Sequence, residues 1–254
     1  MSIEIKKFDP RTMKDGSVSV MIARRGSGKS VLIKDIMYYK RHLAGIAFSG
    51  SESGNNFFGS FMPAVFIYDE FDQDALQRLV DRQKKLKKED KADPVFVILD
   101  DCAFDTKFMN SRLLRFLSFN GRHYNIMLIL SSQWALTLPP SMRGNVDYVF
   151  ILRDNLYRER LYKSFFTFIS SLDTFNKIMD VCTDDYGCLV LDNSGSNSEI
   201  FHYKAKMNRN FRLGPPSYWG FNKQRFNPKY DDDDDDGKDT KKKGSTIAIK
   251  VIRK

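Results

Sequence analysis

The sequence predicts an α/β fold in which helices flank a mostly parallel central sheet. Short apolar runs, rich in β-branched and aromatic residues, alternate with longer stretches in which apolar residues recur at helical spacing. Strands that alternate with helices imply right-handed crossovers and a largely parallel sheet covered on both faces. The near-continuous apolar run at residues 95–99 is typical of the centre of such a sheet.

Six strands and four helices are expected along the first 182 residues. The expected strands are residues 17–23, 45–48, 64–68, 94–100, 125–132 and 147–152, and the expected helices are residues 29–39, 72–88, 109–119 and 156–182. Beyond them, residues 187–192 and 199–205 flank the turn sequence Asn-Ser-Gly-Ser-Asn. That pattern predicts an antiparallel hairpin at the edge of the sheet.

Composition divides the chain into one folded domain and two C-terminal segments. We expect a domain over residues 1–206, an extension rich in aromatic residues, Pro and Gly over residues 207–230, and a disordered charged tail over residues 231–254. The tail holds seven acidic and seven basic residues, so the net charge of +9 belongs to residues 1–230. An electropositive body of this kind suits a polyanionic partner such as nucleic acid.

Several classes of protein are excluded by composition. The N-terminus lacks the basic-then-apolar order of a signal peptide, and no apolar run of about 18 residues predicts a membrane span. The three cysteines lack the paired spacing of a metal site, and one would remain unpaired in any disulfide scheme. The three histidines likewise show no metal-site spacing. We therefore expect a soluble protein of a reducing, intracellular compartment.

The strongest functional signal is a glycine-rich loop between an apolar strand and an apolar helix. Its residues are Ala23, Arg24, Arg25, Gly26, Ser27, Gly28, Lys29 and Ser30. In this strand–loop–helix context the sequence is typical of a P-loop, whose backbone N–H groups and helix N-terminus bind phosphate. Lys29 is expected to reach the β- and γ-phosphates of ATP, and Ser30 to bind Mg²⁺. Ala23 stands where the pattern has its first glycine.

A pair of acids at the end of the strand at residues 94–100 supplies candidate catalytic groups. Asp100 is expected to complete the Mg²⁺ shell, and Asp101 to orient or deprotonate an attacking water. Capping of the following turn is the structural alternative for this pair. Gln133 follows the next strand, at the edge where open α/β sheets bind ligands, and is expected to sense the γ-phosphate.

Two arginines are candidates for a finger that stabilises transition-state charge. Arg122 precedes the strand at residues 125–132, so it is expected on the side of the sheet away from its own nucleotide and able to reach a neighbouring subunit. Arg143 is the second candidate, as a finger or a contact to a DNA phosphate. Without further support, both are ordinary surface arginines.

The ordered set of motifs resembles one family. Ala-x-x-Gly-x-Gly-Lys-Ser, an apolar strand with Asp-Asp, Gly-Arg-His-Tyr, a strand ending in Ser-Gln, and Leu-Pro-Pro-Ser-Met-Arg-Gly-Asn-Val-Asp occur in that order. Over residues 10–206 the sequence resembles the genome-packaging ATPases of nucleocytoplasmic large DNA viruses, the poxvirus-type branch of the FtsK/HerA superfamily. The resemblance implies a RecA-like ATPase core that works as a ring, a hexamer, and drives double-stranded DNA into preformed capsids.

The same resemblance assigns roles to residues. It implies Walker-type roles for Lys29, Ser30, Asp100 and Asp101, an arginine finger at Arg122, and a sensor at Gln133. Superfamily members with Glu at the second acidic position differ from Asp101, whose side chain is shorter. It further implies capsid or portal-vertex proteins as partners, and the host cytoplasm, the viral factory or the virion as the location.

Other functions remain open from the residues alone. A helicase or partition-type ATPase would use the same loop, as would a nucleotide kinase, although no Arg-rich lid for a kinase is found. A nucleotide-gated capsid-vertex component would bind ATP without turnover. Four lysines of the helix at residues 72–88 are candidate DNA-phosphate contacts, against the simpler interpretation of a solvated face; they are Lys84, Lys85, Lys87 and Lys88.

Overall fold

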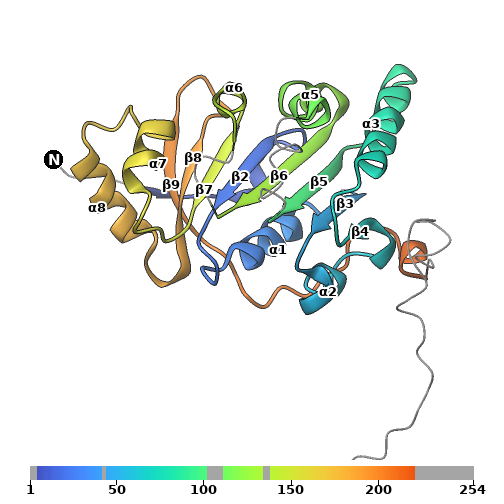
Figure 1. Cartoon of the computed structure of the whole chain (residues 1–254), viewed down its shortest axis with the longest axis horizontal. Helices are drawn as coiled ribbons and strands as arrows, with labels where there is room; N and C mark the ends of the chain where they lie inside the picture. Colours follow the sequence, from blue (N-terminus) through green and yellow to red (C-terminus); the bar gives the residue numbers. More distant parts are fainter. Residues whose placement is uncertain (1–4, 42–43, 102–110, 134–137, 221–254) are drawn as a thin grey trace, which may run out of the picture.

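The computed structural model describes residues 5–41, 44–101, 111–133 and 138–220. Its centre is a nine-stranded sheet in the order β1-β9-β8-β7-β2-β6-β5-β3-β4 (Figure 1). The strands are β1 (Lys6–Lys7), β2 (Val18–Ile22), β3 (Ala44–Ser49), β4 (Ile67–Tyr68), β5 (Val95–Asp100), β6 (Ile126–Ser132), β7 (Tyr148–Ile151), β8 (Gly187–Asp192) and β9 (Glu199–Lys204). Within this sheet only β8 runs against its neighbours. The predicted fold class, a mostly parallel sheet with an antiparallel hairpin, is confirmed.

Helices cover both faces of the sheet (Figure 1). They are α1 (Lys29–Tyr39), α2 (Glu52–Asn55), α3 (Gln73–Lys88), α5 (Arg112–Asn120), α6 (Pro140–Arg143), α7 (Arg158–Phe165) and α8 (Leu172–Cys182). One apolar core holds α3, α5, α7 and α8 against one face, and a second core holds α1 against the other. No helix in the described part of the chain is long and apolar enough to cross a bilayer.

Strand periodicity decides which side chains face α1. Along β5, Val95, Val97 and Leu99 join the core under α3 and α5, whereas Phe96 and Ile98 join the core under α1. Successive side chains of a strand point to opposite faces. Asp100, the last residue of β5, therefore lies on the α1 face of the sheet with Phe96 and Ile98. All other residues of β5 are apolar.

Two predicted elements differ from the structure. The expected strand at 64–68 is a 3-10 helix (Ala64–Phe66) followed by the two-residue β4. The chain turns directly after Pro63 and pairs with β3, at the edge of the sheet, only over these last two residues. The expected helix at 156–182 is broken into α7 and α8. Buried Phe166 turns the chain into the core, and the Ser171 hydroxyl accepts a hydrogen bond from the Thr174 N–H (3.1 Å) to begin α8.

The edge beyond the hairpin also differs from expectation. The predicted antiparallel hairpin forms as β8–β9 and pairs with β7, but it is not at the edge of the sheet, because β1, which carries no apolar pattern, pairs with β9 and takes that position. Helix α5 begins at Arg112 on the Ser111 cap, three residues later than expected. Residues 109–110 of the expected helix lie outside the described residues.

Residues 205–220 pack back onto the domain, first against α1 and then against residues 61–66. Leu213 is buried and its N–H donates to the Phe61 carbonyl (2.8 Å), and the Phe211 ring lies 5.3 Å from the Phe61 ring. The charged tail at 231–254 lies outside the described residues.

A buried carboxylate on α1 fixes this segment. Asp35, with no exposed surface, accepts hydrogen bonds from the Tyr203 hydroxyl, the Lys206 N–H (3.1 Å) and Arg209 Nε (2.5 Å). Burial and the neighbouring Asp35 carboxylate raise the pKa of Tyr203, so its hydroxyl keeps the proton that it donates. The Arg209 guanidinium also lies 3.9 Å from the centre of the Tyr38 ring. These contacts connect β9 and the C-terminal segment to α1, the helix that follows the glycine-rich loop.

Asp35→Ala is expected to lower the free energy of unfolding by about 3–5 kcal/mol, because it leaves a largely buried arginine and two other donors without their acceptor. Chemical denaturation followed by circular dichroism measures the loss. Lys177→Ala, which removes a fully exposed ion pair with Asp173, is the control and is expected to change the midpoint little. Equal effects of the two substitutions would contradict a structural role for Asp35.

Candidate phosphate-binding site

The loop after β2 forms a tight turn at the N-terminus of α1. Gly26 and Gly28 take left-handed backbone angles (φ +78° and +94°), which glycine adopts without strain. The Ser27 N–H and hydroxyl both donate to the Arg24 carbonyl, at 3.3 and 2.5 Å, and close the turn. α1 then begins at Lys29, so its first N–H groups point out of the helix end toward the loop.

Ala23 shows why the loop tolerates the loss of its first glycine. Its N–H donates to the Ser132 carbonyl (3.0 Å), which extends the pairing of β2 with β6 by one residue. The side chain is fully buried in the core under α1. A methyl group is therefore accommodated at this position, and the turn proper begins at Arg24.

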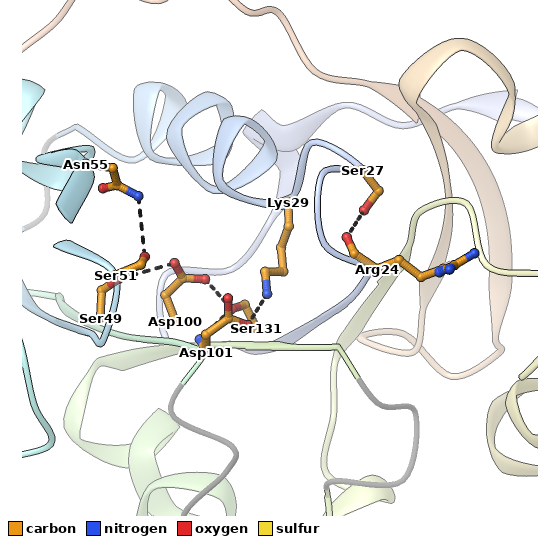
Figure 2. A network of polar contacts seen from close by, with 9 residues as sticks. All are labelled: Arg24, Ser27, Lys29, Ser49, Ser51, Asn55, Asp100, Asp101 and Ser131. Atoms are coloured by element: carbon orange, nitrogen blue, oxygen red, sulfur yellow. Dashed lines mark hydrogen bonds and ion pairs between the residues drawn. The ribbon is translucent and has the colours of Figure 1, made fainter. Parts of the chain in front are cut away.

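Lys29 forms an ion pair with Asp101 across the space beneath the loop (Figure 2). The lysine side chain is only 7% exposed, whereas that of Asp101 is 34% exposed. Asp101 follows β5 and has a left-handed φ of +53°, which is uncommon for a residue other than glycine. This backbone conformation turns Asp101 out of the strand pattern.

Asp100 is held between serines of the two flanking strands. Ser131 of β6 donates a hydrogen bond to its Oδ1, and the Ser49 hydroxyl of β3 lies 3.5 Å from Oδ2. Ser131 Oγ in turn accepts from the Asp101 N–H (3.2 Å), so one serine bonds both acids. Burial raises the pKa of Asp100, against the Ser131 hydrogen bond and the charge of Lys29, which favour the carboxylate.

The strand order brings these groups together although they are far apart in sequence. β6 lies between β2, which leads into the glycine-rich loop, and β5, which ends in the acids. In register, Met21 of β2 pairs with Ser131, and Leu99 of β5 pairs with Leu130. The carboxyl ends of the three parallel strands therefore meet at one edge. Gln133 is exposed directly after β6 at the same edge, and Ser30 lies in the first turn of α1.

The two arginine candidates lie away from that edge. Arg122 is exposed in a 3-10 helix (Gly121–Tyr124) that precedes β6, at the amino edge of the sheet. Arg143 ends the short helix before β7, where its Nε donates to the Leu138 carbonyl (3.0 Å) and Nη1 to the Ser164 hydroxyl (3.3 Å). Arg143 thus serves as a cross-link between α6 and α7, while Arg122 is exposed.

Three of the four lysines of α3 fit a solvated face. Lys85, Lys87 and Lys88 are exposed, whereas the Lys84 ammonium lies 4.3 Å from the centre of the Phe116 ring. At that distance the ring attracts the cation. The structure therefore assigns Lys84 a packing contact with α5.

The two serines beside Asp100 are site residues that the sequence reasoning missed. Neither Ser131 nor Ser49 is among the residues expected at the site from the sequence. Ser49 is the last residue of β3 and pairs in register with Asp100. Its signal was a polar residue at the carboxyl end of an apolar strand, which becomes informative only once the strand order is known.

No protein-family model matches the chain, but proteins of large DNA viruses are similar to it over most of its length. It is 34% identical to the uncharacterized protein 075L of Invertebrate iridescent virus 6 over 229 residues, 85% of this chain and 88% of that protein. It is 33% identical to the uncharacterized protein L437 of Acanthamoeba polyphaga mimivirus over 244 residues, 89% of this chain and 86% of that protein. The relatives are thus proteins of large DNA viruses.

Solved structures share the fold at low identity. The DNA-packaging ATPase B204 of Sulfolobus turreted icosahedral virus has a TM-score of 0.57 and 18% identity, over 78% of this chain and all of that one. The NTPase B204 of Sulfolobus turreted icosahedral virus 2 in complex with AMPPCP has a TM-score of 0.55 and 18% identity, over 74% of this chain and 98% of that one.

The strand order and the loop at the carboxyl edge define a P-loop NTPase fold with one strand between the P-loop strand and the acid-bearing strand. At the identities found, the chain belongs to the family of large-DNA-virus proteins that includes 075L and L437. The predicted likeness to viral genome-packaging ATPases is confirmed at the level of the fold, which the B204 structures share with this chain.

Gly26→Ala is expected to destabilise the fold by about 1–2 kcal/mol, because a Cβ at φ +78° is strained although nothing lies within 4 Å of it. The matched control is Gly54→Ala in α2, which also has open space but no positive φ. Thermal unfolding without nucleotide measures both variants. A loss of stability in Gly54→Ala equal to that in Gly26→Ala would contradict a backbone origin.

Proposed function

We propose that the chain is an ATP-hydrolysing translocase that packages a viral double-stranded DNA genome into capsids. One observation carries the proposal: Lys29, Asp100 and Asp101 meet beneath the glycine-rich loop, at the carboxyl edge of a sheet whose central strand order separates the loop strand from the acid strand. The relatives from large DNA viruses support a role in the viral life cycle.

ATP binds along the loop from Ala23 to Ser30 in this proposal. The N–H groups at the start of α1 and the positive end of its dipole stabilise the phosphates. Lys29 exchanges Asp101 for a phosphate oxygen, since a phosphate presents more negative charge to the ammonium than one carboxylate. Because the ammonium is largely buried, it requires an anion both before and after this exchange.

The donors around Asp100 fit a magnesium ion. Mg²⁺ in nucleotide sites binds one or two protein oxygens together with phosphates and water, and Asp100 and the Ser30 hydroxyl are oxygen donors of that kind. When bound, the ion neutralises phosphate charge. The hydrogen bond from Ser131 keeps the Asp100 carboxylate oriented. Burial raises the pKa of Asp100, and the positive charge of the cation would counteract this effect by favouring the carboxylate.

Asp101 and Gln133 act on the attacking water. Once Lys29 turns to the phosphate, the Asp101 carboxylate becomes available to accept a proton from water. Gln133, exposed at the end of the neighbouring strand, orients the same water and senses the γ-phosphate. The Asp101 side chain is partly exposed, which leaves room for water beside it.

Arg122 acts in trans, in a ring of identical subunits. β6 has seven residues and spans about 20 Å, so an arginine at its amino end cannot approach the phosphates at its carboxyl end. An exposed arginine at that edge is available to the site of a neighbouring subunit, and a finger of this kind contributes about 10³–10⁵ in rate. The partners are double-stranded DNA and capsid or portal-vertex proteins, in the host cytoplasm or viral factory.

Wild-type protein is expected to hydrolyse ATP faster when long duplex DNA is added. Lys29→Ala and Asp101→Asn are each expected to reduce the DNA-stimulated rate at least 100-fold, because they remove the phosphate ligand and the water-activating group. Phosphate release measures the rate, and the circular dichroism spectrum of each variant controls for folding. DNA-stimulated hydrolysis by Lys29→Ala would overturn the proposal, and strand separation on a forked duplex would favour a helicase.

Equal mixtures of wild type and Arg122→Ala are expected to hydrolyse ATP at well below half the wild-type rate, because in a ring whose subunits act in a coordinated cycle one site that lacks its neighbour's arginine stops the other sites as well. The matched control is Arg115→Ala, which removes an exposed arginine of α5. The ATPase rate is measured against protein concentration for both mixtures. A rate that is independent of concentration, with the Arg122→Ala mixture at half activity, would exclude a trans-acting finger.

A further inference from the structure

A cavity of about 420 Å³ lies on the side of the loop away from the acidic pair. Six residues from three segments line most of it: Arg24 and Arg25 of the loop, Arg153 and Asn155 after β7, and Asp185 and Tyr186 before β8. Its volume falls within the range of roughly 300–1,000 Å³ typical of small-molecule sites. Its lining combines three arginines with one acid, Asp185, and one aromatic ring, that of Tyr186.

The cavity lies where the nucleoside end of a bound nucleotide must go. β2 has β6 and β5 on one side, with Asp100 and Asp101 at their carboxyl edge, and β7 and β8 on the other. Figure 2 shows Arg24 on the opposite side of Lys29 from the two acids, with its side chain directed away from them. A triphosphate whose γ end meets the acids therefore has its other end on the cavity side.

Tyr186 is held over the loop by a strained turn. Asp185 and Tyr186 both have left-handed backbone angles (φ +45° and +58°), and two such residues in succession are rare without glycine. A Cβ on Gly187 would lie 2.4 Å from the Cys182 carbonyl oxygen, so only glycine fits after them. Strain of this kind is retained at ligand-binding loops, where the surroundings determine the conformation.

The Tyr186 ring is both exposed and close to the phosphate loop. The residue is 65% exposed, and a Cβ placed on Gly28 would lie 3.5 Å from its Cδ1 atom. A mostly exposed aromatic ring in a tight, strained turn gains little from packing. A free ring face beside a phosphate-binding loop is instead suited to stack on a planar ligand.

We propose that this cavity binds the base of a purine nucleoside triphosphate, with the Tyr186 ring as the stacking surface. The inference rests on the proposed function, since it takes the phosphates to lie on the loop and Lys29. Stacking of a base on an aromatic side chain strengthens binding by roughly 5- to 150-fold. Purines offer a larger ring surface than pyrimidines, so the site discriminates between them.

The test separates binding of the base from binding of the phosphates. Dissociation constants of ATP, CTP and inorganic tripolyphosphate are measured by calorimetry, with Mg²⁺, for wild type, Tyr186→Ala and Tyr186→Phe. Phe168→Ala, which removes another half-exposed ring on the turn between α7 and α8, is the matched control. Tripolyphosphate has no base, so its affinity reports the integrity of the loop in each variant.

Tyr186→Ala is expected to weaken ATP binding about tenfold, to abolish the preference for ATP over CTP, and to leave tripolyphosphate binding within twofold of wild type. Tyr186→Phe keeps the ring and is expected to bind ATP as wild type does. Unchanged ATP affinity in Tyr186→Ala, or equal losses for ATP and tripolyphosphate, would overturn the inference alone. Failure of wild type to bind either ligand would overturn the proposed function with it.

Discussion

The constraint on which the site depends is the largely buried ammonium of Lys29. A charge with so little access to water requires an opposite charge within hydrogen-bonding distance, and Asp101 provides it. This requirement couples elements that are distant in sequence: the left-handed glycines that open the loop, the start of α1, and the residue that leaves β5 with a positive φ. In the proposed function a phosphate takes the place of Asp101, and it must then provide the negative charge that this ammonium requires.

The parallel sheet explains why the two neighbouring acids have different surroundings. Asp100 ends an apolar strand on the α1 face, where serines of β3 and β6 supply its hydrogen bonds. Asp101 leaves the strand, remains partly exposed and meets the lysine. Burial raises the pKa of Asp100, whereas Asp101 has access to water. Ser131 of β6 donates to the Asp100 carboxylate and accepts from the Asp101 N–H, so this one serine holds both residues against β6.

The local order of apolar and polar residues predicts most of the helices and strands. Most of the elements that it does not predict depend on pairing between strands far apart in the sequence. α1 has the expected bounds because glycine, lysine and an apolar run specify a loop and a helix within a few residues. β1 and β4 are two residues each, and their pairing with β9 and β3 depends on the finished sheet rather than on their own composition. The break between α7 and α8 was missed because an aromatic run fits a helix until tertiary packing buries Phe166. Ser49 likewise gains its meaning only when β3 pairs with β5.

The two edges of the sheet have different consequences for assembly. The carboxyl edge gathers the loop, the acids and Gln133, whereas the amino edge presents Arg122. A rigid parallel sheet keeps these edges a strand length apart, so no rotamer of Arg122 brings its guanidinium to the site of its own subunit. Arg143, the other arginine considered, already bonds to Leu138 and Ser164 and holds α6 against α7. If catalysis requires an arginine from the amino edge, it follows from the fold itself that the site is completed only between two copies.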